Sequence, residues 1–443
     1  MTLEAARIEY SDHGGWLGEV PTTWRVGPLR RFCNITLGKM VTKDEGVVKG
    51  PTRPYVRAAH VQPSGVWSLT DIKEMAFTSN EATRLTLLRG DVVVVEGGAG
   101  FGRSAVLREA LVGWGFQNSI NRVRVFDGDG RFANYALLAA QASGHFETLI
   151  NTATIPHLTA EKLADVQVAW PEGEVQRQIA DYLDVQTGKI DALTGKQERL
   201  IETLAERRQA VISHAVTKGL NPNVPMKESG VEWLGVIPSN WVALSLNRLI
   251  SNPLKYGANE AAVHDNPEWP RYIRITDFGT DGALREETFR SLPPELAREY
   301  SLKGGDILLA RSGATAGKSF LVPNDISASC FAGYLIRVSL NRARSRPRFI
   351  SYFLSSSPFA EWRSLVVIQA TIENISAERY ARMPVPVPSV EEQDDIVEYL
   401  DRETAQIDAL SAKAREMIDV LKERRQALIS AAVTGKIDVR GLT

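Results

Sequence analysis

The chain has 443 residues, enough for two to four domains, and its 44% hydrophobic and 24% charged residues are ordinary values for a globular protein. No stretch approaches 18 apolar residues and the first residues form no apolar core, so neither a membrane span nor a signal peptide is expected. The two cysteines, Cys33 and Cys330, exclude a disulfide framework and favour a reducing cytoplasm. The net charge of −1 argues mildly against a general nucleic-acid binder, although a local basic face remains possible.

The chain contains one long internal repeat. The segment from Leu204 to Thr217 returns almost unchanged from Leu421 to Thr434, 217 residues later. Four further features return at the same distance, namely Trp16-Leu-Gly at Trp233, Trp24 at Trp241, Tyr55 at Tyr272 and Arg57 at Arg274. Repeats of solenoids are far shorter, roughly 20 to 50 residues. The pattern predicts a duplicated domain with its helix, in a nearly two-fold chain suited to a bipartite target or a pair of identical partners.

The first part of each copy, about 16–171 and 233–388, is expected to mix strands and helices. Short β-like runs separated by turns with glycine or proline occur at 91–96, 121–126, 306–310 and 334–338. One helical stretch is expected after the last of these strands in each copy, near 131–142 and 347–355.

The second part of each copy, about 174–218 and 391–435, is expected to be one long helix that begins after Pro171 or Pro388. The positions of a heptad seam, most but not all of them apolar, alternate in steps of three and four. They are Leu183, Gln186, Ile190, Leu193, Gln197, Leu200, Leu204, Arg207, Val211 and His214, and in the copy Leu400, Glu403, Ile407, Leu410, Ala414, Met417, Leu421, Arg424, Leu428 and Ala431. Two helices of ~60 Å are expected to pack antiparallel as a coiled-coil spacer, and burial in an ordinary bundle is the alternative. The fold class is therefore α+β, with two mixed α/β domains separated by two long antiparallel helices.

Glycine-rich turns follow a strand in both copies. They share Gly-x-x-x-Gly, a basic residue and serine, with Arg103-Ser104 in one copy and Lys318-Ser319 in the other. Neither completes a P-loop, because Arg103 stands where lysine is needed and Ser312 where the first glycine is needed. A basic tip on a glycine turn suits a phosphate backbone, while a nucleoside-triphosphate loop and a purely structural turn are the alternatives. No methyltransferase motif, zinc spacing or nucleophile elbow is present, so no cofactor or metal is expected on this chain.

Basic residues mark two further places. Arg57 and Arg274 sit on β-like runs with tyrosines two residues earlier, where each arginine contacts DNA or forms a structural ion pair. Five arginines lie between 337 and 348, where the first copy is acidic, so this cluster is expected outside the common architecture, as a solvated loop or as a phosphate contact of the second domain. The helical parts are near-duplicates, whereas the mixed parts diverge between shared positions, which implies two different ligands at a fixed separation.

The order of these motifs resembles the DNA specificity subunit of type I restriction–modification systems. The matching residues are Glu228–Trp241 with the shorter counterpart Trp16–Trp24, the run 305–318, Glu391-Glu-Gln, Tyr399-Leu-Asp401, and the repeated Leu-x-Glu-Arg-Arg-Gln-Ala-x-Ile-Ser. The resemblance implies an N-terminal arm (1–15), target-recognition domain 1 (16–172), a central helical spacer (173–230), target-recognition domain 2 (231–389) and a C-terminal helical spacer (390–443).

The resemblance also implies the function and the partners. Each recognition domain would read one half of a bipartite double-stranded DNA target, the helices would set the gap, and the subunit itself would be non-catalytic. It would dock two methyltransferase subunits and, through them, restriction and translocase subunits, with S-adenosylmethionine and ATP/Mg on those partners. The candidate DNA-binding residues are Arg57, Arg103, Asn118, Arg122, Arg274, Arg311 and Lys318. The competing hypotheses are an assembly scaffold that does not read DNA and a P-loop or methyltransferase-like enzyme.

Overall fold

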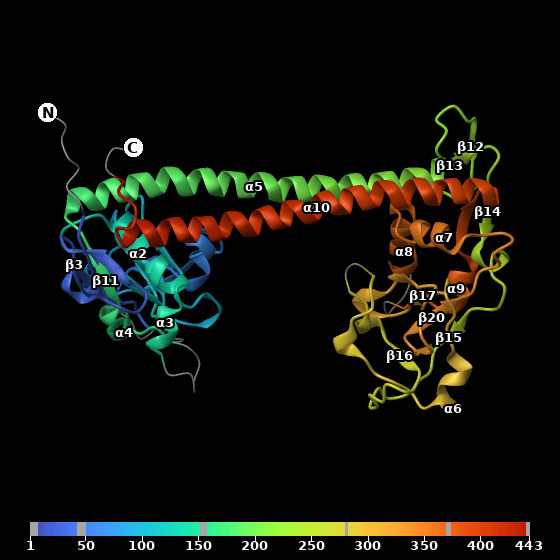
Figure 1. Ribbon diagram of the computed structural model, residues 1–443, viewed down its shortest axis with the longest axis horizontal. Helices are drawn as coiled ribbons and strands as arrows, with labels where there is room; N and C mark the ends of the chain where they lie inside the picture. The colour runs from blue at the N-terminus through green and yellow to red at the C-terminus, as the bar shows by residue number, and fades with distance from the viewer. Residues whose placement is uncertain (1–7, 42–49, 151–156, 280–281, 369–373, 440–443) are drawn as a thin grey trace. The chain divides into compact units, whose positions relative to one another are not determined.

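The computed structural model describes residues 8–41, 50–150, 157–279, 282–368 and 374–439 (Figure 1). The chain divides into two compact units. The first comprises Met1–Gln197 with Glu416–Thr443, and the second comprises Glu198–Arg415. Each unit contains a mixed domain and one half of each long helix.

The first unit is built around a four-stranded antiparallel sheet in the order β4-β10-β7-β8. Strand β5 pairs with β6 antiparallel and with β9 parallel, while β3 pairs with β11 and β1 with β2. Its strands are β1 (Tyr10–Asp12), β2 (Glu19–Pro21), β3 (Arg25–Pro28), β4 (Cys33–Leu37), β5 (Thr52–Val56), β6 (Lys73–Ala76), β7 (Val92–Val95), β8 (Ser104–Val106), β9 (Gly115–Phe116), β10 (Ile120–Val125) and β11 (Gln167–Trp170). Its short helices are α1 (Ser79–Arg84), α2 (Gly130–Ala142), α3 (His145–Thr148) and α4 (Ala160–Asp165).

The second unit repeats this plan with the sheet order β15-β20-β17-β18. Strand β16 pairs with β19 parallel, β14 with β21 and β12 with β13 antiparallel. Its strands are β12 (Met226–Glu228), β13 (Val236–Pro238), β14 (Val242–Ser245), β15 (Lys255–Tyr256), β16 (Arg271–Ile273), β17 (Ile307–Ala310), β18 (Ser319–Leu321), β19 (Ser329–Phe331), β20 (Leu335–Val338) and β21 (Pro384–Val387). Its short helices are α6 (Pro294–Ala297), α7 (Pro347–Phe353), α8 (Ser357–Ile368) and α9 (Ala377–Arg382).

The strands predicted from the sequence form as β7, β10, β17 and β20, and the two predicted short helices form as α2 and α7. The expectation of one short helix in each mixed part is wrong, because the remaining short helices are only four to twelve residues long and carry little periodic signal. One of them has a readable start. At α1, Thr78 and Glu81 form a capping box, in which each side chain accepts from the backbone N–H of the other residue.

Strands β7 and β17 are apolar throughout because each is buried on both faces of its sheet. Val92 and Val94 belong to the core beneath α2 and α5, while Val93 and Val95 belong to a second core beneath β5 and β9. The second unit divides the side chains of β17 between two cores in the same way. Successive strand residues point to opposite faces, so a run with no polar residue requires cover on both sides.

The long helices are α5 (Gly173–Lys218) and α10 (Val390–Val433), and within each unit they run antiparallel. In the first unit, Arg425 Nε donates to Asp191 Oδ1 at 2.9 Å, and the start of α5 lies beside the chain that follows α10, where Val175 and Ile437 line one cavity. In the second unit, Arg208 Nε donates to Asp408 Oδ1 at 3.1 Å. The predicted pair of long antiparallel helices in coiled-coil packing, and with it the α+β fold class, is confirmed.

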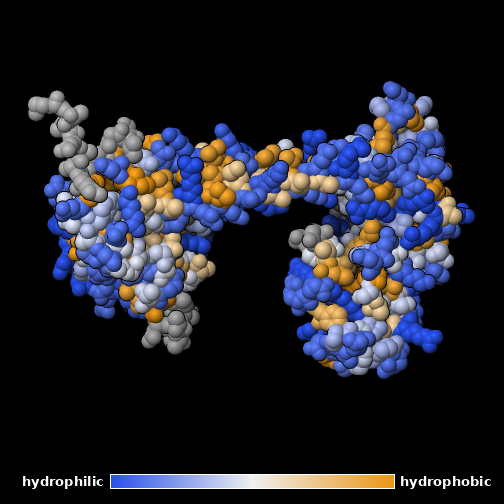
Figure 2. All heavy atoms as spheres, in the orientation of Figure 1, coloured by the Kyte–Doolittle hydropathy of each residue, from blue (hydrophilic) through white to orange (hydrophobic). Residues whose placement is uncertain are grey.

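Half of the predicted heptad positions are wrong. Leu183, Ile190 and Leu204 are buried as expected, but Leu193 and Leu200 are exposed. Of the two lines of positions in the predicted heptad, the second is buried one residue after the predicted positions. It includes small polar residues such as Thr187, whose hydroxyl donates to the carbonyl of Leu183 at 2.6 Å. The copy shows the same offset, with Leu410 and Met417 exposed but Thr404 and Ser411 buried. Leucine is normally the better core residue, so a sequence pattern favours it over threonine. Figure 2 shows hydrophobic residues at the surface along both long helices.

None of the helices in the described part of the chain is long and apolar enough to cross a membrane.

Candidate nucleic-acid interface

The two glycine-rich turns form equivalent hairpins. In the first unit a 3-10 turn at Gly98–Gly100 joins β7 to β8, and in the second a turn at Gly313–Thr315 joins β17 to β18. The last glycine of each turn is left-handed, with φ of 73° at Gly102 and 87° at Gly317, a conformation that favours glycine. The carbonyls of the two following residues, Arg103 and Lys318, each accept from the end of the preceding strand at 2.8 Å. The hairpins therefore present a basic residue at the same place.

These hairpins differ from a P-loop in the element that comes after the glycines. In a P-loop the turn leads into a helix, and the N–H groups at the helix N-terminus hold the phosphates. Here the turns lead into β8 and β18, which pair with β7 and β17 in antiparallel register. Neither described hairpin has the helix N-terminus that a nucleoside-triphosphate site requires.

Arg57 and Arg274 are not strand residues, contrary to the expectation that each sits on a β-like run with its tyrosine. Each lies one residue beyond its strand and precedes a short 3-10 helix. Arg57 donates to the carboxylate and the carbonyl of Asp71 at 2.8 and 2.6 Å. Arg274 donates to the buried carboxylate of Asp277 at 2.8 and 3.2 Å. Both are therefore held in structural ion pairs, the second of the two alternatives that the sequence left open.

Arg122 on β10 is buried, and its guanidinium is used inside the domain. It donates to the carbonyls of Arg84 and Thr86 at 3.0 and 2.8 Å and to Thr36 Oγ1 at 3.0 Å. Burial lowers its pKa to about 10. Contact between Arg122 and a ligand would require breaking these bonds, and its geometry fits a brace between β10 and the chain before β7.

Arg103 and Asn118 are half-buried, and within the described chain their side chains form no hydrogen bond. Arg311 is also half-buried. Its guanidinium lies over the ring of Tyr256 at 4.8 Å, and its Nε approaches Asn374 Oδ1 at 3.4 Å. These side chains keep most of their donors available.

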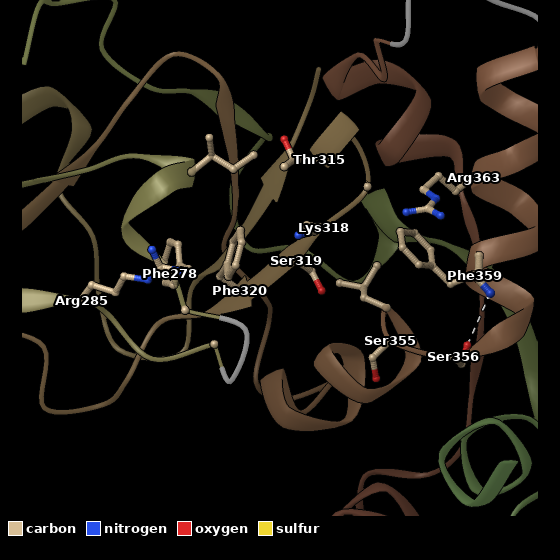
Figure 3. A pocket seen from close by; sticks show the side chains of 16 residues that line it. Phe278, Arg285, Thr315, Lys318, Ser319, Phe320, Ser355, Ser356, Phe359 and Arg363 are labelled. Atoms are coloured by element: carbon tan, nitrogen blue, oxygen red, sulfur yellow. Dashed lines mark hydrogen bonds between the residues drawn. The ribbon is translucent and has the colours of Figure 1, made fainter. Parts of the chain in front are cut away.

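Lys318 is exposed and lines a cavity of about 420 Å³ that lies wholly within the second unit. Figure 3 shows Lys318 and Ser319 near the middle of this cavity, with Arg363 to one side and Arg285 to the other. The glycine-rich pattern indicated Lys318, but Arg285 and Arg363 were not predicted, because they come from distant segments with no local motif.

The arginine cluster of the second unit is largely occupied with intramolecular contacts. Arg346 pairs with Asp394 at 2.6 Å and Arg348 with Asp401 at 2.8 Å, both on α10. The other three, Arg337, Arg342 and Arg344, donate to the backbone carbonyls of Ser301, Gly304 and Arg248. The expectation that the cluster is a solvated loop or a phosphate contact is wrong for Arg346 and Arg348, which tie the mixed domain to its helix. The expectation that it lies outside the common architecture is wrong for Arg348, because Arg131 makes the equivalent contact in the first unit.

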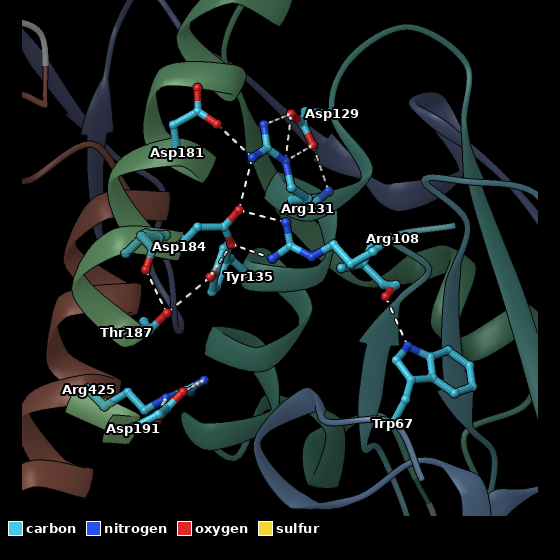
Figure 4. Close-up of polar contacts among 12 residues, drawn as sticks. Trp67, Arg108, Asp129, Arg131, Tyr135, Asp181, Asp184, Thr187, Asp191 and Arg425 are labelled. Atoms are coloured by element: carbon cyan, nitrogen blue, oxygen red, sulfur yellow. Dashed lines mark hydrogen bonds and ion pairs between the residues drawn. The ribbon is translucent and has the colours of Figure 1, made fainter. Parts of the chain in front are cut away.

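A polar joint recurs in both units: its tyrosine, arginine, aspartate and glutamine return 217 positions later, whereas Arg108 has no arginine counterpart. In the first, Asp184 on α5 accepts from the Tyr135 hydroxyl at 2.8 Å, from Arg131 at 2.9 Å and from Arg108 at 2.6 and 2.7 Å (Figure 4). Burial raises the pKa of Tyr135 to about 12, so the phenol remains a donor. Burial also raises the pKa of Asp184, but hydrogen bonds from Arg108 and Tyr135 outweigh it and hold the value below the ordinary one.

The counterpart in the second unit uses Tyr352, Asp401 and Arg348. Tyr352 donates to Asp401 at 2.5 Å, and Arg348 Nε donates to the same oxygen at 2.9 Å. Two glutamines complete the joints, because Gln176 and Gln393 each accept a backbone N–H from the mixed domain, at 3.0 and 2.8 Å. This joint was not predicted from the sequence, although the 217-residue shift of its residues was a signal that could have revealed it.

Comparison with known families decides the identity of the chain. Residues 21–202 and 265–418, well over half of the chain, match the family described as the type I restriction modification DNA specificity domain. The chain belongs to this family. Specificity subunits of type I restriction–modification systems are non-catalytic. The hypothesis of a P-loop or methyltransferase-like enzyme is therefore excluded.

Individual relatives agree with the family. The MjaVIII specificity subunit of Methanocaldococcus jannaschii is 23% identical over 434 residues, which cover 96% of this chain and 95% of the relative. The EcoBI specificity subunit of Escherichia coli is 25% identical over 296 residues, and that match spans 62% of the relative's length and 65% of this chain.

Two solved structures share the fold of this specificity subunit. A chain from a study of complex assembly and conformational transition of the type I R-M system has a TM-score of 0.73 at 17% identity and covers 94% of this chain and 99% of its own. The HsdS subunit from Thermoanaerobacter tengcongensis has a TM-score of 0.51 at 18% identity and covers 94% of this chain and 98% of its own.

Proposed function

We propose that this chain reads DNA for a type I restriction–modification complex by binding a bipartite double-stranded site. Each mixed domain recognises one half-site, and α5 with α10 set the gap between the halves. The helices also dock two methyltransferase subunits, through which restriction and translocase subunits join.

The observation that carries this proposal is the contrast between a repeated frame and unequal faces. The strand order and the joint to the helix recur in both units, whereas the residue against the turn glycine is Phe146 in one and Arg363 in the other. Two readers with one frame and different contact residues are suited to two different half-sites. Direct readout takes place in the major groove, while phosphate contacts set position.

Of the seven candidate DNA-binding residues, those whose side chains form the fewest hydrogen bonds and ion pairs are favoured as the DNA contacts. They are Arg103, Asn118, Arg311 and Lys318. Their donors are wholly or largely unused in the described chain. We assign Arg57, Arg122 and Arg274 a supporting role, because their donors already serve carboxylates or carbonyls of the same domain.

The exposed leucines of the long helices support the docking of two identical partners. Leu193 in the first unit is 46% exposed, and Leu410, 217 residues later in the second, is 52% exposed. Each unit thus offers the same apolar helix position, and large apolar side chains kept at a surface in a repeated pattern are typical of interaction sites. S-adenosylmethionine and ATP/Mg would be bound by the partner subunits, and none by this chain.

The test is to co-express the chain with a methyltransferase subunit and map methylated adenines across the host genome by single-molecule sequencing. We expect one motif with two halves and a fixed gap. Replacing residues 233–388 with the corresponding segment of another family member should change one half only. If the methylated motif stayed the same after this replacement, the result would favour an assembly scaffold that does not read DNA.

The gap is tested separately by lengthening both helices. A heptad inserted after Lys196 and another after Lys413, its counterpart 217 residues later, preserves the pairing of the helices. Seven residues add ~10 Å of helix, so the gap should grow by about three base pairs at 3.4 Å each. A heptad of glycine and serine inserted at the exposed Val112 is the control and should leave the gap unchanged.

A further inference from the structure

The cavity beside Lys318 in the second unit is unusual in its charge. Three cationic side chains, Arg285, Lys318 and Arg363, line it, and no aspartate or glutamate occurs among its described lining residues. Neighbouring arginines of the same domain, such as Arg271 and Arg274, each pair with a carboxylate. Within the described residues the side chains of the three lining cations form no ion pair or hydrogen bond. Like charges around one cavity repel each other unless an anion neutralises them.

The cavity also contains hydrogen-bonding and apolar groups that suit a nucleic-acid backbone. The Ser319 hydroxyl forms no hydrogen bond to the described chain and lies next to Lys318 (Figure 3). Phe278 and Phe320 stack with ring centroids 3.8 Å apart and give the cavity an apolar wall. A row of phosphates alternating with sugars has the same mixture of charge and apolar surface.

The arrangement of the cations favours a strand over a single small anion. In Figure 3, Arg285 and Arg363 lie on opposite sides of Lys318, with Phe278 and Phe320 between Arg285 and Lys318. A free phosphate can contact only one part of such a row. A DNA strand carries a phosphate every 3.4 Å of helix axis, so it can engage the whole row.

The first unit does not repeat this charge. Arg103 replaces Lys318 there, but Phe146 lies against Gly102 where Arg363 lies against Gly317. Arg285 directly follows Leu284, which forms a β-bridge with Phe278. The equivalent bridge of the first unit joins Val61 to Trp67, and the residue that directly follows Trp67 is Ser68. Three cations in the second unit thus correspond to one in the first.

We propose that this cavity holds consecutive backbone phosphates of the half-site bound by the second domain, and that Arg285, Lys318 and Arg363 are its phosphate contacts. The proposal rests on the proposed function, because it requires DNA binding by this domain. The second domain then contacts the backbone more extensively than the first, independently of which bases it reads.

The test uses the full chain in complex with its methyltransferase and measures binding of duplex DNA between 50 and 200 mM salt. The variants are K318Q alone and R285Q/K318Q/R363Q together. Each lost phosphate contact reduces the slope of log K against log salt by about 0.9, so we expect a decrease of about 0.9 for the single variant and up to about 2.7 for the triple variant. The methylated motif should stay the same, because phosphate contacts carry no sequence information. K227Q, which removes an exposed lysine on β12, is the matched control and should keep the wild-type slope.

Three outcomes overturn the proposal. The unfolding transition of the triple variant should be unchanged, because within the described residues these side chains form no ion pair or hydrogen bond. A wild-type slope in this folded variant would exclude a backbone contact. A changed motif would show that the residues read bases. A rise in melting temperature with inorganic phosphate, seen in the wild type but not in the triple variant at matched ionic strength, together with an unchanged DNA slope, would reassign the cavity to a small anion. If the wild-type complex shows no bipartite preference at all, the proposed function fails instead, and this is seen before any variant is made.

Discussion

The joint between the first mixed domain and α5 gives the sharpest prediction of stability. The Asp184 side chain is only 20% exposed and accepts hydrogen bonds from Arg108, Arg131 and Tyr135. Asp184→Asn keeps the shape but removes the charge and turns one acceptor into a donor. Hydrogen bonds to charged groups contribute about 1.5–3 kcal/mol each and are not additive. Arg131 retains its bonds to two other carboxylates, so we expect a loss of about 3 kcal/mol.

The assay is the melting transition of the first unit, monitored calorimetrically in the full chain. For a unit of this size, about 3 kcal/mol corresponds to a decrease of about 6–12 °C in melting temperature. Asp181→Asn is the matched control, because Asp181 is 58% exposed and its one ion pair within the described residues is with Arg131, and it should cost less than about 1 kcal/mol.

The pH dependence follows from the lowered pKa of Asp184 in the folded state. The unfolded chain binds the proton more readily, so the stabilisation is fully present above the ordinary aspartate pKa of about 4 and is lost as pH falls through the folded value. The difference between wild type and D184N should therefore be constant from pH 7 to 5 and shrink below about pH 4. Equal melting temperatures at pH 7, or a difference unchanged down to pH 3, would refute this account of the joint.

Single contacts elsewhere in the chain give three further predictions. Arg122→Gln removes the Arg122 donor from the carbonyl of Arg84 and leaves the carbonyl of Thr86 with the longer hydrogen bond from Arg124 at 3.2 Å, so it should cost about 1–3 kcal/mol in urea unfolding, while any methylation that survives keeps the same motif. Arg346→Asp should destabilise the second unit and Asp394→Arg should rescue it in the double variant, with a favourable coupling in the double-mutant cycle; a coupling of zero would mean that the pair is not formed. Leu193→Lys or Leu410→Lys should reduce the methyltransferase subunits bound per chain from two to one in native mass spectrometry without changing stability, and two subunits retained by the double variant would exclude this surface.

The fold was predictable where the signal is periodic and the burial is complete. Val92–Val95 and Ile307–Ala310 are apolar because two cores require it, and the long helices follow from their length and their low glycine content. The heptad register was half wrong because the chain exposes Leu193 and buries Thr187. A sequence pattern reports how apolar a position is, but not whether its apolar contact is within the chain or with a partner.

The candidate site was less predictable, for a geometric reason. Arg57 and Arg274 stand in a recognisable pattern, yet the pattern does not show that a nearby carboxylate engages each of them, Asp71 for Arg57 and Asp277 for Arg274. Conversely, Lys318 follows a glycine-rich pattern but Arg285 and Arg363 follow none, and only the packing of a loop, a hairpin and α8 brings the three around one cavity. Contacts that depend on several segments are fixed by tertiary structure, and a single sequence does not display them.

One departure from the repeat affects how the duplicated chain assembles. Asp129 in the first domain corresponds to Arg346 in the second, and Arg177 on α5 corresponds to Asp394 on α10, so both charges are reversed together. Arg346 pairs with Asp394, while Glu174 and, more weakly, Asp129 raise the pKa of Arg177. If the first domain packed on α10 instead of α5, Asp129 would lie next to Asp394. If the second domain packed on α5 instead of α10, Arg346 would lie next to Arg177. The tyrosine, the aspartate and the glutamine of the joint are the same in both units and do not distinguish the two helices. Like charges in the crossed arrangement therefore favour the docking in which each domain stays on its own helix.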